Sequence, residues 1–203
     1  WLLHSRLPTL PPNAQLLTPR SPNPRLPNPK SRLLTTTEAP LLRGDRLTIK
    51  AGEAVQVAAS DAQRRGNPSL EDIHLLRALL DQEGTVVVPI LRKVGVNIGW
   101  VEEGLEAALE RLPRQSGGAA PMVSRELNRI FEEAEREAEG LGDEYISTEH
   151  LLVALALHKG STTRDLLAEQ GVTRDVLLEA LSSVRGPHRV TDQDAEEKYQ
   201  ARE

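Results

Sequence analysis

The chain has 203 residues and a formal net charge of −5, from 25 basic and 30 acidic side chains, and it has no cysteine. The lack of cysteine excludes disulfides, cysteine zinc ligands and a cysteine nucleophile. Aromatic residues make up 2% of the chain, which favours a helical core of Leu, Val, Ile and Ala and argues against stacking on single-stranded nucleic acid. No apolar run approaches the roughly 18 residues of a transmembrane helix.

Residues 1–43 differ in composition from the rest of the chain. They contain nine of the 14 prolines and six basic residues, but one acidic residue, Glu38. Proline at this density interrupts helix and sheet hydrogen bonding, so this leader is predicted to be disordered. An Arg-rich, acid-poor leader is typical of an organelle transit peptide. The favoured interpretation is upstream sequence read through in a fragment, because the chain starts at Trp1 and not at methionine.

From residue 45 onward, apolar residues recur at the three- and four-residue intervals of a helix face. The first helix is predicted over residues 51–62 and stops at Gly66. Ser69 is the predicted N-cap of the second helix, whose apolar stripe covers residues 73–80, with Asp72 completing an imperfect capping box.

Two further helices complete this half of the chain. Pro89 stands in the first turn of a short third helix that closes at Gly95. The fourth helix covers residues 101–112, and residues 114–121 then have the composition of a flexible linker.

The pattern then repeats at an offset of 76 residues, without a gap. Ala58 and Gly66 correspond to Ala134 and Gly142, and the register gives 14 identities over about 50 positions. These identities fall on core and cap positions, which indicates a duplicated four-helix unit. Each unit alone has too little apolar surface for a good core, so the two halves are expected to pack as one domain.

Nothing in the chain forms a familiar catalytic motif. There is no phosphate-binding loop, no pair of histidines four residues apart and no nucleophile elbow. His74 and His150 occupy equivalent helix starts, where a ring nitrogen is expected to bond the backbone. The run of glutamates over residues 132–139 follows a helix and is expected to face solvent. A hydrolase with a carboxylate site stays open as a weak alternative, while the acidic folded part argues against nucleic acid as partner.

The repeated sequence resembles the Clp N-terminal repeat. Its first copy runs from Ser69 to Leu80 and its second from Ser147 to Leu155, each followed by a glycine and a Gly-Val pair, and the match covers residues 45–187. Three features are similar to the ClpB-type disaggregase branch, namely Asp45-Arg46-Leu47-Thr48, the exit Leu109-Glu110-Arg111-Leu112-Pro113, and the tail from Val190 to Tyr199.

The resemblance implies an all-α fold of about eight helices in two pseudo-symmetric repeats, at residues 45–113 and 121–187 of a domain spanning 44–187. Residues 188–203 are then a linker to an ATPase module. The implied function is non-catalytic capture of unfolded or aggregated polypeptides, with no cofactor here and with ATP and Mg²⁺ bound elsewhere. The full-length protein is expected to form a homohexamer in the bacterial cytoplasm, or in an organelle matrix or stroma if the leader is a transit peptide. The isolated domain is expected to be a monomer that binds neither nucleic acid nor membrane.

The resemblance also implies site residues. Thr48, Asp143 and Glu149 match polar positions that contact substrate in the family, although each also suits a structural role as cap, turn or first-turn residue. The expected apolar groove along the second repeat is represented by Ile130, Phe131 and Tyr145.

Acidic residues interrupt that expected groove. Glu133 and Glu137 lie on the same stretch, which suggests a weaker groove or a preference for segments that carry Lys or Arg. The alternative function is docking of a folded adaptor, as in the ClpA and ClpC branch.

Overall fold

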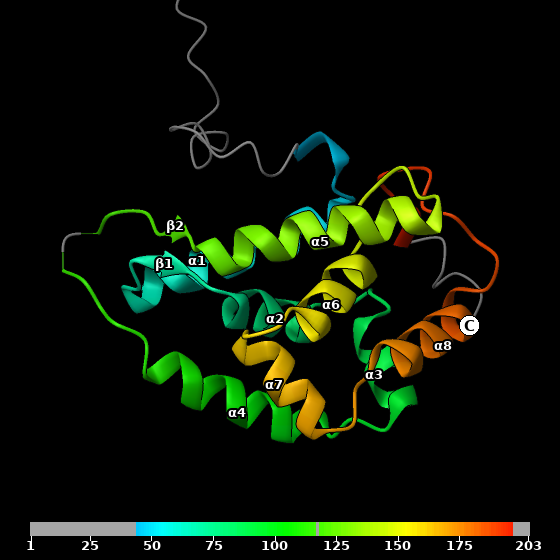
Figure 1. The fold of residues 1–203 in the computed structure, drawn as a ribbon. Coiled ribbons are helices and arrows are strands. Elements are labelled where there is room, and N and C mark those ends of the chain that lie inside the picture. The colour runs from blue at the N-terminus through cyan, green and yellow to red at the C-terminus, as the bar shows by residue number, and fades with distance from the viewer. Residues whose placement is uncertain (1–43, 117, 197–203) are drawn as a thin grey trace, which may run out of the picture. The chain divides into compact units, whose positions relative to one another are not determined.

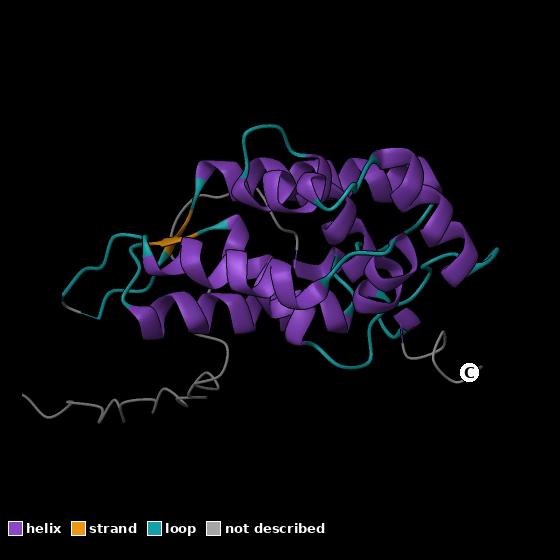
Figure 2. Ribbon diagram, turned by 90° about the horizontal axis from the view of Figure 1, so that it is seen from below, coloured by secondary structure: helices purple, strands orange, loops and turns teal. Residues whose placement is uncertain are grey.

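The eight helices begin and end at positions that repeat along the chain. The computed structural model describes residues 44–116 and 118–196, all within one compact unit, and the predicted leader lies outside them. The elements are a 3₁₀ turn at Gly44–Arg46, α1 Ile49–Arg65, β1 Ser69–Leu70, α2 Asp72–Asp81, α3 Val87–Val94, α4 Ile98–Glu110, β2 Met122–Val123, α5 Arg125–Leu141, α6 Thr148–Leu157, α7 Thr162–Glu169 and α8 Arg174–Arg185. The all-α prediction is confirmed (Figures 1 and 2).

Equivalent caps define the two repeats. Thr48 accepts a hydrogen bond from the N–H of Ala51 at the start of α1, and Ser124 does the same for Leu127 at the start of α5. Both helices have 17 residues and end at a glycine with positive φ, which a side chain would disfavour. The duplication predicted from the sequence is therefore present in the structure.

The first helix of each repeat packs against the second, and the two second helices, α2 and α6, also contact each other. Figure 1 shows α2 and α6 between α5 on one side and α4 on the other. Nine of the ten residues of α6 are buried, so this helix lies in the core. Its first turn carries the polar side chains of Thr148, Glu149 and His150, all of them buried.

The prediction of Ser69 as an N-cap is wrong. Ser69 and Leu70 instead pair in parallel with Met122 and Val123. The N-cap of α2 is Glu71, two residues after Ser69, and the helix begins at Asp72. The chain entering the second repeat supplies hydrogen bonds to this segment, which draws it out of the helix. The small sheet thus joins the segment between α1 and α2 to the segment that leads into α5.

The described end of the chain packs onto the domain. Val190 is fully buried, and Ala195 and Glu196 are 3% and 1% exposed. The prediction of residues 188–203 as a linker rested on the lack of an apolar stripe, and periodicity could not reveal this docking, because the segment binds largely through its backbone. None of the described helices is long and apolar enough to cross a membrane.

Candidate functional site

The N-termini of α1 and α6 meet at one place in the domain. The N–H of Thr48 donates to the carbonyl of Ile146 at 3.0 Å, and the N–H of Ile146 donates to the carbonyl of Arg46 at 2.7 Å. This bridge sets the first turn of α1 beside the first turn of α6. Two sets of helix N–H groups, which have no partner within their own helices, therefore face the same region.

His150 and Asp143 form the centre of a buried polar network in that region. His150 Nδ1 accepts from the N–H of Ser147 at 3.0 Å, so the ring carries its proton on Nε2 and donates to Asp143 Oδ2 at 3.0 Å. The expected backbone bond of the histidine is confirmed here and at His74, where Glu71 N–H donates to Nδ1 at 3.1 Å.

Arg185, the last residue of α8, supplies the counter-charge to Asp143. Its guanidinium bonds both carboxylate oxygens, with Nη1 to Oδ2 at 2.6 Å, and the N–H of Val190 donates to Oδ1 at 2.8 Å. Burial alone raises the pKa of Asp143, but the bonds from His150, Arg185 and Val190 outweigh it and hold that pKa well below its usual range. Asp143 is therefore ionised and holds three segments together.

Two further acids, Glu149 and Glu196, are buried beside this network. Glu196 Oε1 accepts from Thr48 Oγ1 and from the N–H of Thr148, both at 2.9 Å. Burial, and then the negative charge of Glu149, raise the pKa of Glu196. Neither oxygen of Glu149 has a hydrogen-bond partner, nor has Glu196 Oε2, and Glu149 Oε1 lies 4.0 Å from Arg185 Nη1. These two carboxylates are thus buried with less hydrogen bonding than a charged group normally has.

We call residues 190–196 the C-terminal strap. The carbonyl of Val190 accepts from the N–H groups of Glu144 and Tyr145 at 2.9 and 3.3 Å, and the carbonyl of Gln193 accepts from the N–H of Ile49 at 2.9 Å. Together with the Glu196 carboxylate, the strap satisfies one N–H at the start of α1 and one at the start of α6. The space between these helix starts, which we call the cleft, is therefore filled by the strap, which turns over residues 192–194 and is helical at 195–196.

The structure brings together three of the six predicted site residues. Thr48, Asp143 and Glu149 are 1%, 5% and 0% exposed and all lie in this network. Tyr145 is half-buried at its edge and bonds the strap through its backbone. Ile130 and Phe131 are 0% and 2% exposed in the core, so the expectation that they present apolar surface is wrong. They point into the domain because α5 packs that face against α6.

Sequence reasoning missed four residues of this region. Ile49 and Leu141, 47% and 37% exposed, are apolar side chains at the start of α1 and the end of α5. Arg185 and Glu196 complete the charged network. One signal was present in the repeat register, since Glu149 stands where the first repeat has Ile73. An acid at an apolar position of a duplicated core indicates a local change of role.

The two glutamates that interrupt the expected groove, Glu133 and Glu137, are paired. Glu133 accepts from His158 Nδ1 at 2.9 Å, and Glu137 accepts from Arg174 Nη2 at 2.8 Å. A preference for Lys- or Arg-bearing segments therefore receives no support from these two side chains. Among the described residues, no group of three or more His, Asp or Glu side chains could hold a metal ion.

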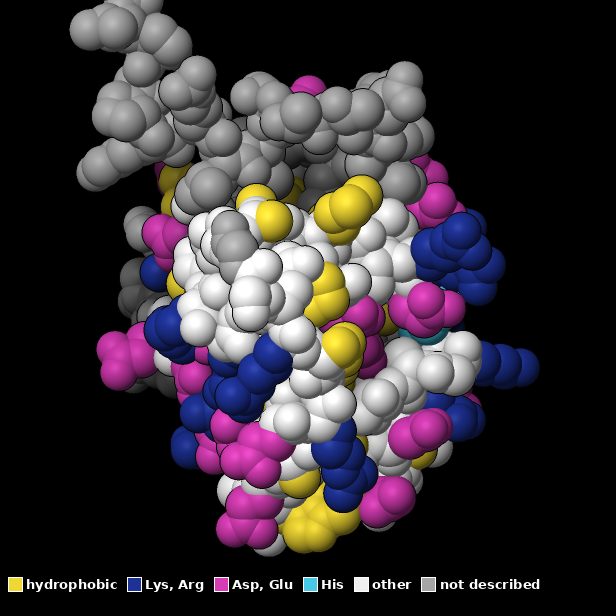
Figure 3. Space-filling model, turned by 90° about the vertical axis from the view of Figure 1, so that its left-hand side faces the viewer, with side chains coloured by type: hydrophobic (Ala, Val, Ile, Leu, Met, Phe, Trp, Pro, Cys, Tyr) yellow, Lys and Arg dark blue, Asp and Glu magenta, His cyan; other side chains and the backbone are white. Residues whose placement is uncertain are grey.

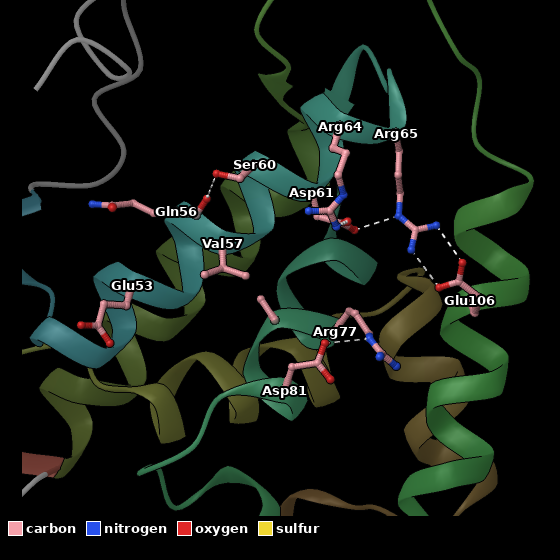
Figure 4. Close-up of a pocket in the computed structure, with 11 residues that line it drawn as sticks. Glu53, Gln56, Val57, Ser60, Asp61, Arg64, Arg65, Arg77, Asp81 and Glu106 are labelled. Atoms are coloured by element: carbon pink, nitrogen blue, oxygen red, sulfur yellow. Dashed lines mark hydrogen bonds and ion pairs between the residues drawn. The ribbon is translucent and has the colours of Figure 1, made fainter. Parts of the chain in front are cut away.

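A second hollow, of about 540 Å³, lies between α1, α2 and α4. In it Arg65 bonds both Asp61 of its own helix and Glu106 of α4 (Figure 4). Arg77 is paired with Asp81 at 3.0 Å. On the face drawn in Figure 3, acidic and basic side chains alternate and apolar ones are scattered. The groove is thus a polar surface with matched charges.

Comparison with known proteins gives a consistent family. Residues 46–183 match the Clp repeat (R) N-terminal domain. Over 161 residues the chain is 40% identical to the chaperone protein ClpB of Rhodopirellula baltica, covering 79% of this chain and 18% of that protein. The chain therefore spans less than a fifth of the length of this relative.

Solved structures share the fold. The N-terminal domain of Hsp104 from Candida albicans superposes with a TM-score of 0.65 at 20% identity, covering 74% of this chain and 98% of that one. A ClpV N-domain, described as a complex with a VipB peptide, superposes with a TM-score of 0.56 at 19% identity, covering 72% and 94%.

Proposed function

Because the chain belongs to the family of Clp repeat N-terminal domains and is 40% identical over 161 residues to a chaperone protein ClpB, we propose that it captures exposed segments of unfolded or aggregated polypeptides for a ClpB-type disaggregase. Capture itself is non-catalytic, and the captured segment passes to an ATPase ring outside this chain. ATP and Mg²⁺ belong to that ring, which forms the homohexamer. The N-domain acts as a monomer in the bacterial cytoplasm, without nucleic acid or membrane as partner.

One observation carries this proposal. The cleft between the starts of α1 and α6 already holds a segment of polypeptide through main-chain hydrogen bonds, from Ile49, Glu144 and Tyr145 to strap carbonyls. Main-chain bonds do not depend on the side chains of the bound segment, which suits a site that receives many sequences. A ClpV N-domain is also described in complex with a peptide.

Side chains around the cleft add the remaining contacts. Ile49 and Leu141 offer exposed apolar surface, and Tyr145 adds an aromatic ring at the edge. Thr48 donates from its hydroxyl to a carboxylate in the cleft, and Asp143 accepts from a backbone N–H. Glu149 contributes negative charge beside them. In this proposal Ile130 and Phe131 support the site from the core and do not touch the bound segment.

The competing function is docking of a folded adaptor. The groove between α1, α2 and α4 has the open, charged surface that a folded partner would contact. Its charges are matched within the groove, and the relative described above is a ClpB protein, so we favour capture of unfolded chain.

The test is a titration with one protein in two states. A fluorescein-labelled lactalbumin, reduced and carboxymethylated so that it stays unfolded, is titrated with the chain and followed by fluorescence anisotropy. Binding of the unfolded form with a dissociation constant in the micromolar to millimolar range supports capture. Equal binding of the native, disulfide-bonded form would overturn it. So would the absence of binding of either form both to the parent chain and to the Glu196→Ala variant described below.

A further inference from the structure

The C-terminal strap occupies the same groups that the proposed site would use for a ligand. The Ile49 amide bonds Gln193, the Thr48 hydroxyl and the Thr148 amide bond Glu196, and the Asp143 carboxylate bonds Val190. An incoming polypeptide cannot use these groups while the strap does. The site is thus closed from within the chain in this structure.

The chemistry of the closed cleft works against tight closure. Three carboxylate oxygens, both from Glu149 and one from Glu196, are buried without a hydrogen-bond partner. Two acids of like charge are held close enough for Glu149 to raise the pKa of Glu196. Opening the strap lets water reach these oxygens and separates the charges, which lowers the cost of release.

The apolar anchoring of the strap is also slight. Its buried apolar side chains are those of Val190 and Ala195, which bury far less area than the Leu and Phe side chains of the core. The attachment depends mainly on hydrogen bonds, which water replaces at little net cost. The strap therefore resembles a bound ligand more than a part of the core.

We propose that residues 190–196 are an internal ligand of the cleft between α1 and α6, which polypeptides enter only when the strap leaves. This inference rests on the proposed function for the identity of the incoming chain. Among the segments that the cleft accepts, the best fit is one that turns as the strap does and carries an apolar residue and, six positions later, an acidic side chain, because Val190 and Glu196 fill it in that spacing. The acid binds at the N-terminus of α6, where the N–H of Thr148 donates to it.

Two matched substitutions test the competition. Glu196→Ala removes the carboxylate held by Thr48 and Thr148, whereas Asp194→Ala removes an acid from an exposed position of the same strap. Glu196→Ala is expected to raise the affinity for the unfolded lactalbumin probe by about tenfold, as a larger fraction of molecules is open. Asp194→Ala is expected to leave it unchanged. Equal affinities of the parent chain and Glu196→Ala would overturn the proposal.

A synthetic peptide with the sequence of residues 188–203 tests the strap as a ligand, independently of any unfolded protein. Labelled with fluorescein, it is expected to bind the Glu196→Ala chain at least about tenfold more tightly than the parent chain, whose cleft is filled. The same peptide carrying the Glu196→Ala change is expected to bind neither. Binding that ignores this change, or is equal in both chains, contradicts an internal ligand.

The two experiments separate failure of the inference from failure of the proposed function. If the strap peptide binds as expected but unfolded lactalbumin binds no variant, the internal ligand stands and polypeptide capture is wrong. If lactalbumin binds the parent chain and Glu196→Ala equally, capture stands and the strap does not compete. Circular dichroism of each variant confirms that the helices are formed, so that lost binding is not lost folding.

Discussion

The two repeats solve the same local problem with different chemistry. In the first, His74 Nε2–H donates to the neutral side chain of Asn67 at 3.1 Å, and Asn67 bonds the carbonyl of Pro113. In the second, the equivalent histidine meets Asp143, which also bonds Arg185 and Val190. One amide exchanged for a carboxylate thus makes the second turn a charged hub, which bonds Arg185 of α8 as well as the segment that follows that helix.

The difference shows how duplication can create a site without a new fold. Both histidines keep the same bond to the backbone at their helix start, so the scaffold is unchanged. The added charge of Asp143 requires Arg185, and Asp143 also accepts the backbone N–H at the start of the strap. In the first repeat the chain after α4 docks on the equivalent turn, where Asn67 bonds the Pro113 carbonyl and the N–H of Gln115 donates to the carbonyl of Gly66, without an ion pair.

The largest expected effect comes from removing the hub. Asp143→Ala leaves Arg185 buried without its counter-charge and is expected to cost about 3–5 kcal/mol in the free energy of unfolding. Asn67→Ala, the matched change in the first repeat, removes neutral hydrogen bonds and is expected to cost about 1–3 kcal/mol. Urea denaturation followed by circular dichroism measures both, and equal costs would remove the distinction between the repeats.

A double substitution gives the second repeat the neutral pair of the first, an amide beside the histidine. Asp143→Asn with Arg185→Met replaces the ion pair by an amide and an apolar side chain. It is expected to lose about 1–2 kcal/mol, less than either single change, because no charge is left buried alone. A double-mutant cycle in urea measures the coupling. Additive losses would show that Asp143 and Arg185 act independently.

The helix caps give a smaller and graded comparison. Ser124→Ala removes the cap of α5 and is expected to cost about 1 kcal/mol. Thr48→Ala removes the equivalent cap of α1 and also a hydrogen bond to the buried Glu196, so about 1 kcal/mol more is expected. Thermal or urea unfolding measures the difference, which should vanish when Glu196→Ala is already present.

The smallest effect is a dependence on pH. The raised pKa of Glu196 means that its protonated form favours the docked strap, an advantage present below its usual pKa of 4.5 and lost as pH rises through the raised value. Glu149, Asp143, Arg185 and His150 face the same region and are common to both chains compared. Glu196→Gln should therefore gain stability relative to the parent chain as pH rises above 4.5, and parallel pH profiles would contradict the assignment.

The fold could be predicted from the sequence because helices leave local patterns of apolar spacing and capping residues. Apolar spacing, glycine stops and the register between halves placed every helix of the two repeats. Thr48, Asp143 and Glu149 were predicted as site residues from the family resemblance, and the structure places them together. Sequence reasoning placed Ser69 wrongly, because its pairing partner Met122 is distant in sequence.

The rest of the site depends on contacts that no local pattern reveals. Ile130 and Phe131 lie on an apolar stripe, and only packing of α5 on α6 shows that the stripe faces inward. The strap has neither helical nor strand periodicity, so its docking through backbone groups could not be predicted. Arg185 has the sequence position of an ordinary basic residue at a helix end. Its bond to Asp143, 42 residues away, could not be predicted from a local pattern.

The central claim is that polypeptide enters the cleft as the strap leaves it. Amide hydrogen exchange with and without unfolded lactalbumin tests this most directly. When the probe binds, the amide of Val190 is expected to exchange faster, because its hydrogen bond to Asp143 breaks. The amides of Ile49 and Thr148 are expected to stay protected, because the probe takes the place of the strap. Bound probe with unchanged exchange at Val190, or protection confined to the groove between α1, α2 and α4, would contradict it.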